Sequence, residues 1–191
     1  GSGPHHGAKT ERVLDYLDAN GLSENTLVRY TSDQGFYLGE HGWFDKRWMY
    51  EESFKMPFLI KSPATIIPGT ISDDKIMNID FAPTLLDFAG LSIPEEMQGR
   101  SFKNTFTKNS DTKRNAVYYH YYEYPIWHNV QPHYGVRTDK YKLIHFYYSM
   151  DEWELYDMDA DPHEMNNIYE NADSGLISKL KFKLDSLKKY Y

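Results

Sequence analysis

The chain has 191 residues, of which 40% are hydrophobic and 26% are charged, and this is the composition of a folded globular protein rather than a disordered one. The formal net charge of −7 argues against nucleic acid as a partner, because phosphate backbones are bound by basic patches. There is no cysteine, which excludes disulfides and thiolate metal sites, and no stretch approaches the ~20 apolar residues that a membrane-spanning helix needs.

The N-terminal residues suggest a lead-in followed by a helix and a strand. Residues 1–7 (GSGPHHG) are expected to be a flexible or vector-derived lead-in outside the fold. Residues 11–20 predict a helix with one apolar face, and Gly21 is placed to end it. Residues 26–31 are rich in β-branched and aromatic side chains and predict a strand.

A polar cluster, Ser-Asp-Gln-Gly, follows this predicted strand directly. In open α/β sheets, ligands bind beyond the carboxyl ends of the strands. Asp33 and Gln34 both offer hard oxygen atoms, which suit calcium or magnesium, and Gly35 lets the backbone leave the strand without steric cost. On these residues alone a solvated acidic turn stays an alternative, because calcium takes roughly 6–8 ligands.

Residues 36–53 are rich in glycine and charge and predict a long functional loop. This loop holds His41, eight residues after Asp33, and Lys46, thirteen residues after Asp33. A carboxylate, an amide and an ammonium group in one segment could together hold a divalent cation and an anionic group beside it. Residues 57–61 then predict a second strand.

The second half of the chain predicts a different arrangement. Asp80 is expected to cap a helix that runs to about Phe88. Beyond a subdomain boundary near residue 112, short strands are expected at residues 116–122, 134–137, 141–147 and 154–156, with a hairpin turn at Asp139-Lys140. A last helix begins near Ser174 and carries leucines at one-face spacing, which predicts packing on the sheet.

The run from Thr31 to Arg47, followed by Met49–Ser53 and Met56–Phe58, closely resembles the second metal motif of type I sulfatases, which belong to the alkaline phosphatase-like superfamily. The resemblance continues in the same order through Asp80–Leu86 to the C-terminal residues. It implies an α/β fold: part of an alkaline phosphatase-like mixed sheet with flanking helices in residues 8–111, and a small C-terminal antiparallel sheet packed by a helix in residues 112–191.

The resemblance also assigns roles to individual residues. Asp33 and Gln34 match a pair of calcium ligands, and Lys46 matches the lysine that contacts the sulfate and offsets the charge on the leaving oxygen. His41 is the further catalytic candidate in this loop, although a structural role is the favoured interpretation.

The family's nucleophile is a formylglycine made from a Cys or Ser in a C/S-x-P/S-x-R motif, and this chain has no such motif. We expect the formylglycine in an N-terminal part that is absent here, together with the remaining calcium ligands. The chain is therefore expected to be a fragment that alone is inactive as a sulfatase and binds calcium weakly or not at all. We also expect self-association through surface that truncation exposes.

The expected function is hydrolysis of sulfuric esters on a sulfated carbohydrate. In the loop of residues 123–134, Trp127, His128 and His133 are candidates for substrate binding; the alternative that they pack the subdomain interface stays open. Two other functions also stay open: a phosphonate or phosphodiester hydrolase of the same superfamily, and a non-catalytic glycan-binding module. By resemblance, we expect a periplasmic or extracellular location.

Overall fold

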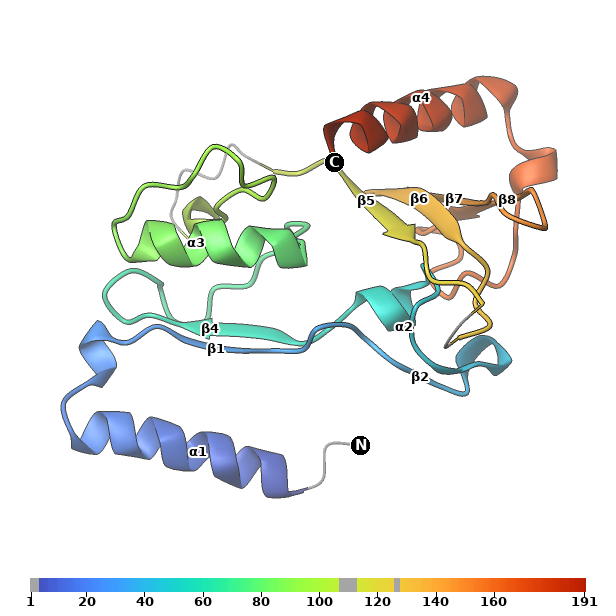
Figure 1. The fold of residues 1–191 in the computed structure, drawn as a ribbon. Coiled ribbons are helices and arrows are strands. Elements are labelled where there is room, and N and C mark those ends of the chain that lie inside the picture. Colours follow the sequence, from blue (N-terminus) through green and yellow to red (C-terminus); the bar gives the residue numbers. More distant parts are fainter. Residues whose placement is uncertain (1–3, 107–112, 126–127) are drawn as a thin grey trace.

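The computed structural model describes residues 4–106, 113–125 and 128–191 (Figure 1). The α-helices are α1 (Pro4–Ala19), α2 (Glu51–Phe54), α3 (Phe81–Phe88) and α4 (Ser174–Tyr190). The strands are β1 (Val28–Thr31), β2 (Tyr37–Leu38), β3 (Phe44–Asp45), β4 (Phe58–Lys61), β5 (Ala116–Tyr121), β6 (His133–Thr138), β7 (Tyr141–Phe146) and β8 (Glu152–Asp157). In these described ranges no helix combines the length and the apolar character needed to cross a membrane.

The first half of the chain is built on an antiparallel pair of strands. β1 pairs with β4, so that Val28 lies opposite Lys61 and Thr31 lies opposite Phe58. The strands predicted at residues 26–31 and 57–61 are therefore confirmed. The helices α1 and α3 lie on opposite sides of this pair (Figure 1). The α1 helix begins at Pro4, so residues 4–7 are helical rather than a flexible lead-in; proline is well tolerated in the first turn.

Residues 36–53 form a packed segment rather than one continuous loop. β2 and β3 pair with each other, with Tyr37 opposite Asp45, and α2 follows. The side chains of Tyr37, Met49 and Tyr50 are buried in a hydrophobic core. Strands of two residues are too short to show a period in the sequence, which explains why the segment resembled a loop.

The second half of the chain is an antiparallel sheet in the order β5-β6-β7-β8. The hairpin turn expected at Asp139-Lys140 lies between β6 and β7 as predicted. Leu143 and Leu155 are paired across β7 and β8, and both side chains pack with Leu180 and Leu184 of α4. The predicted leucine face of the last helix is therefore confirmed. The predicted subdomain boundary near residue 112 falls outside the described residues.

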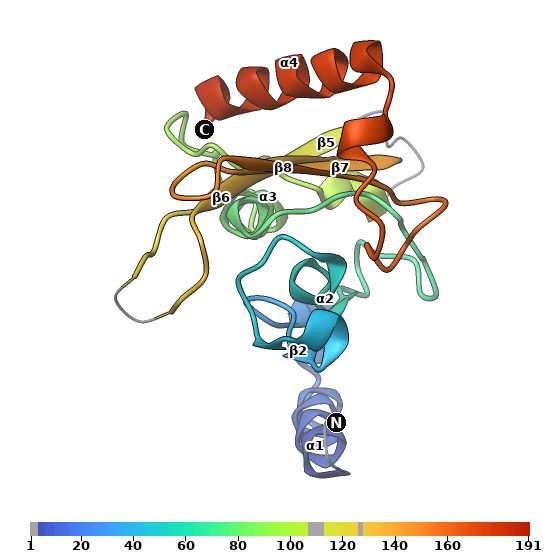
Figure 2. The same cartoon turned by 90° about the vertical axis from the view of Figure 1, so that its right-hand side faces the viewer.

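The other face of this sheet packs on residues 37–54 of the first half, which we call the motif segment. Ile144, Phe146 and Tyr156 share a buried cluster with Tyr37, Met49 and Tyr50. The sheet thus lies between α4 on one side and residues 37–54 on the other (Figure 2). This contact fixes the motif segment against the C-terminal sheet.

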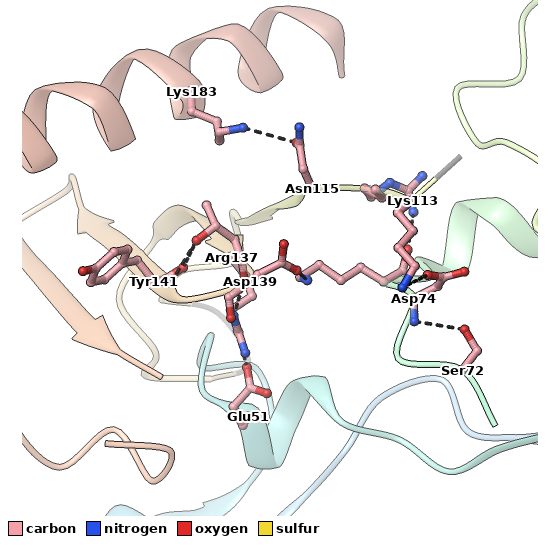
Figure 3. Close-up of polar contacts among 12 residues, drawn as sticks. Glu51, Ser72, Asp74, Lys113, Asn115, Arg137, Asp139, Tyr141 and Lys183 are labelled. Atoms are coloured by element: carbon pink, nitrogen blue, oxygen red, sulfur yellow. Dashed lines mark hydrogen bonds and ion pairs between the residues drawn. The ribbon is translucent and has the colours of Figure 1, made fainter. Parts of the chain in front are cut away.

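Paired charges are buried at the same contact. The Lys142 ammonium, on β7, lies 2.9 Å from a Glu51 carboxylate oxygen on α2 and 2.6 Å from one of Glu164. The Arg137 guanidinium, on β6, lies 3.1 Å from Glu51 (Figure 3). Buried charges are tolerated when they are paired, so this cluster sets the position of α2 relative to the sheet.

Asp80 precedes α3, as predicted, but its side chain does not cap the helix. The buried carboxylate instead accepts hydrogen bonds from the backbone N–H groups of Met77 at 2.7 Å and Arg100 at 3.0 Å. It also pairs with both terminal nitrogens of the Arg114 guanidinium. Asp80 therefore joins three segments around the start of α3, which a local capping pattern could not reveal.

Candidate functional site

Asp33 and Lys46 meet in the structure. Asp33 lies just beyond the end of β1 and Lys46 directly follows β3. The Lys46 ammonium nitrogen is 2.7 Å from Oδ2 of Asp33. Its hydrogen bond and its charge hold the pKa of the Asp33 carboxyl below its ordinary value. The Asp33 side chain is 77% exposed, so one of its faces is open to other groups.

Gln34 has a different hydrogen-bond partner from Asp33. Its amide nitrogen donates a hydrogen bond of 2.6 Å to Oγ of Ser53, so the amide oxygen is the end of the side chain that can accept or coordinate. Asp33 and Gln34 both line a pocket of about 270 Å³, whose walls include Asn78 and Tyr119. The pocket lies between these residues and β5, which contributes Val117, Tyr118 and Tyr119 to its walls.

The oxygen atoms of Asp33 and Gln34 fit a calcium ion as part of a ligand set. Both are hard donors, but calcium takes roughly 6–8 oxygen ligands. Among the described residues, no group of three or more His, Cys, Asp or Glu side chains is arranged to hold a metal. As donors the two side chains fit part of a calcium site, and they do not complete one by themselves.

Gly35 is required by close backbone packing. A Cβ atom at this position would lie 2.0 Å from the carbonyl oxygen of Glu52 and 2.9 Å from that of Lys55. The Gly35 N–H donates to the carbonyl of Ser53 at 2.7 Å. The sequence indicated glycine for its backbone freedom, whereas the structure shows that no other side chain has room.

His41 has structural contacts. Its ring stacks on Tyr50 at 4.6 Å and meets the edge of Tyr37 at 6.2 Å. Its Nε2 lies 3.4 Å from a carboxylate oxygen of Glu52. These contacts fix the loop between β2 and β3, and they fit the structural role that the sequence favoured over a catalytic one.

Asp45 and Arg47, on either side of Lys46, are additional site candidates. Both have positive backbone φ angles, 90° for Asp45 and 102° for Arg47, which are uncommon for residues with side chains. They form an ion pair with each other, and Tyr119 donates a 2.7 Å hydrogen bond to the carbonyl of Arg47. Such strained conformations cluster at functional sites. The only signal in the sequence was their place beside Lys46.

The three candidates for substrate binding have different outcomes. His128 is 30% exposed, and its ring nitrogens lie 3.2 Å from Glu123 and 4.0 Å from Asp45, so it lies beside the Lys46 segment. His133 is fully buried among aromatic rings, and burial lowers its pKa to about 4. The structure therefore places His133 in the core, where it cannot reach a substrate, and corrects that prediction. Trp127 lies outside the described residues.

Comparison with known proteins identifies the family. A family model described as "N-sulphoglucosamine sulphohydrolase, C-terminal" matches residues 39–190. An N-acetylglucosamine-6-O-sulfatase of Bacteroides thetaiotaomicron is 56% identical over 165 residues, which cover 85% of this chain and 30% of that protein. An N-acetylglucosamine-6-sulfatase of Bos taurus is 31% identical in an alignment of 209 residues. This alignment covers 93% of this chain and 37% of that protein.

A solved structure shows the same arrangement. It is described as a complex with its substrate D-glucosamine-2-N,6-O-disulfate, and it aligns with a TM-score of 0.91 and 51% identity over 95% of this chain and 37% of that chain. This chain thus spans about a third of the length of the relatives it matches. The family match covers most of the chain, and the chain therefore belongs to the sulfatase family, matching the C-terminal region of the N-sulphoglucosamine sulphohydrolases.

Proposed function

We propose that this chain is the C-terminal part of a sulfatase that hydrolyses the 6-O-sulfate ester of N-acetylglucosamine units in sulfated glycans. The observation that carries the proposal is the 2.7 Å contact between Lys46 and Asp33, which puts an ammonium that can bind an anion beside a carboxylate that can bind a metal ion. The 56% identical relative named for this activity supports the substrate.

In this proposal each site residue has a defined task. The Lys46 ammonium binds the sulfate and stabilises the negative charge that develops on the leaving oxygen. The oxygens of Asp33 and Gln34 hold one side of a calcium ion, which supplies Lewis-acid polarisation of the sulfate when bound. The nucleophile, a formylglycine, would come from the part of the longer protein that precedes these residues.

We assign sugar recognition to three polar residues near Lys46, namely Asp45, Arg47 and His128. The Arg47 guanidinium can donate to sugar hydroxyls, the Asp45 carboxylate can accept from them, and the His128 ring can do either. The ion pair between Asp45 and Arg47, and the 4.0 Å approach of His128 to Asp45, hold these groups together. They replace His133 as candidates for substrate contact.

An assay of the longer enzyme tests this function. We expect release of sulfate from N-acetylglucosamine-6-O-sulfate, and much less release from the 3-O-sulfate isomer as the matched control. Residues 1–191 alone should give no turnover, because the nucleophile is missing. Faster turnover of a phosphonate monoester than of any sulfate ester would favour the phosphonate hydrolase instead.

We further propose that the longer enzyme acts in the periplasm or outside the cell, since polymeric sulfated glycans are found there. Fractionation of the native host, followed by immunodetection of the enzyme, tests this location. Recovery with the cytoplasmic fraction would contradict it.

We also propose that residues 1–191 alone self-associate. Tyr30 and Leu59 are cross-strand neighbours on one face of the β1–β4 pair, and they are 42% and 67% exposed. Exposed apolar neighbours of this kind promote association. Sedimentation velocity should show larger species as concentration rises, and Leu59→Lys should reduce them. A monomer at every concentration would contradict this expectation.

A further inference from the structure

Ser53 contacts both segments of the site. Its side chain is fully buried in α2. Its Oγ accepts hydrogen bonds from the Gln34 amide nitrogen at 2.6 Å and from the Arg47 backbone N–H at 3.2 Å. Its carbonyl oxygen accepts a third hydrogen bond, of 2.7 Å, from the N–H of Gly35. One residue therefore joins the segment that carries Asp33 and the segment that carries Lys46.

The contact with Ser53 determines which end of the Gln34 amide faces outward. A glutamine side chain ends in one acceptor oxygen and one donor NH₂ group. Because the NH₂ group is engaged by Ser53, the oxygen is left for a cation. Without this hydroxyl the amide could rotate, and its NH₂ group would then repel a cation.

Ser53 is itself held firmly in place. The α2 helix has only four residues, so it depends on contacts outside itself. Glu51, at its first position, is paired with Lys142 and Arg137 of the C-terminal sheet. The Glu51 N–H also donates to the Glu164 carboxylate at 2.7 Å. The C-terminal sheet thus fixes α2, and α2 presents the Ser53 hydroxyl.

We propose that Ser53 is a positioning residue that orients Gln34 toward calcium and sets the Lys46 segment beside it. This role rests on the proposed function, because it presupposes that Gln34 is a calcium ligand. Mutation of a residue that orients a metal ligand typically lowers metal affinity by about 10- to 100-fold.

Calcium binding by the longer enzyme tests this role. After removal of bound metal with a chelator, isothermal titration calorimetry with calcium chloride should show about 10- to 100-fold weaker binding by Ser53→Ala than by wild type. Thr84→Val is the matched control, since it also removes a buried hydroxyl, one that accepts from the Phe102 N–H at 3.0 Å and donates to the Asp80 carbonyl at 2.7 Å. It should lower the unfolding temperature without changing calcium affinity.

The outcomes separate the two proposals. If Ser53→Ala binds calcium as tightly as wild type, the positioning role is overturned and the proposed function stands. If wild type itself binds no calcium, the metal site fails and both proposals fail together. Ser53→Cys keeps a side chain of similar size with a weaker donor and acceptor, so it serves if Ser53→Ala does not fold, and its affinity should lie between those of wild type and Ser53→Ala.

Discussion

At the scale of single residues, the ion pair between Asp33 and Lys46 lies at the centre of the candidate site. Thirteen positions separate them, yet the structure brings their charged atoms to 2.7 Å. Motif resemblance could anticipate this contact because both residues lie in one continuous segment. It could not anticipate the burial of His133, which depends on rings from β5, β7 and Trp48 that come together only in the folded chain.

Replacing Lys46 should affect turnover far more than stability. In the longer enzyme, Lys46→Met is expected to lower kcat by about 10²- to 10³-fold, because it removes charge stabilisation from the transition state. The unfolding temperature should stay close to that of wild type, since exposed ion pairs contribute little to stability.

Lys140→Met provides the control for this loss of charge, because Lys140 pairs with Asp157 at 3.4 Å on the surface of the C-terminal sheet. Its kcat should match wild type. Equal kcat values for Lys46→Met and wild type would remove Lys46 from the chemistry.

At the scale of elements, helices and strands with a regular pattern of residues were predictable. Very short strands, and contacts between residues far apart in the sequence, were not. The leucine face of α4 and the four strands of the C-terminal sheet each follow from a repeating pattern in their own residues. The pairing of β2 with β3 involves two residues on each strand, which is too few to leave a pattern. The buried ion cluster of Glu51, Lys142 and Glu164 joins residues up to 113 positions apart, so no local pattern could reveal it.

The buried histidine on β6 should make the fold sensitive to acid. The pKa of His133 is lowered by burial to about 4, against an ordinary value of 6.5. The unfolded chain therefore takes up a proton as the pH falls below 6.5, whereas the folded chain does so only near pH 4. Stability is complete above pH 6.5 and falls by about 3 kcal/mol between there and pH 4 from this group alone.

Urea denaturation of His133→Phe at pH 7 and pH 4 measures this effect. Phenylalanine keeps an aromatic ring among Trp48, Tyr121 and Phe146 but has no group to protonate. The loss of stability between the two pH values should be about 3 kcal/mol smaller in the variant than in wild type. Equal losses would show that the fold does not lower the pKa of His133.

At the scale of the whole molecule, the C-terminal sheet packs against the segment that carries part of the site. One face of the sheet holds α4, and the other packs on residues 37–54, which carry Lys46 and Ser53 (Figure 2). The α/β class and this small antiparallel sheet follow from the sequence. The partial mixed sheet expected for the first half is seen here as the antiparallel β1–β4 pair.

A crystal structure of the longer enzyme, with calcium and N-acetylglucosamine-6-O-sulfate bound and the nucleophile replaced, tests the assignment of the site most directly. We expect oxygens of Asp33 and Gln34 at about 2.3–2.6 Å from the calcium ion, and the Lys46 nitrogen hydrogen-bonded to the sulfate. A calcium ion held by other residues, with Lys46 turned away from the sulfate, would contradict the assignment.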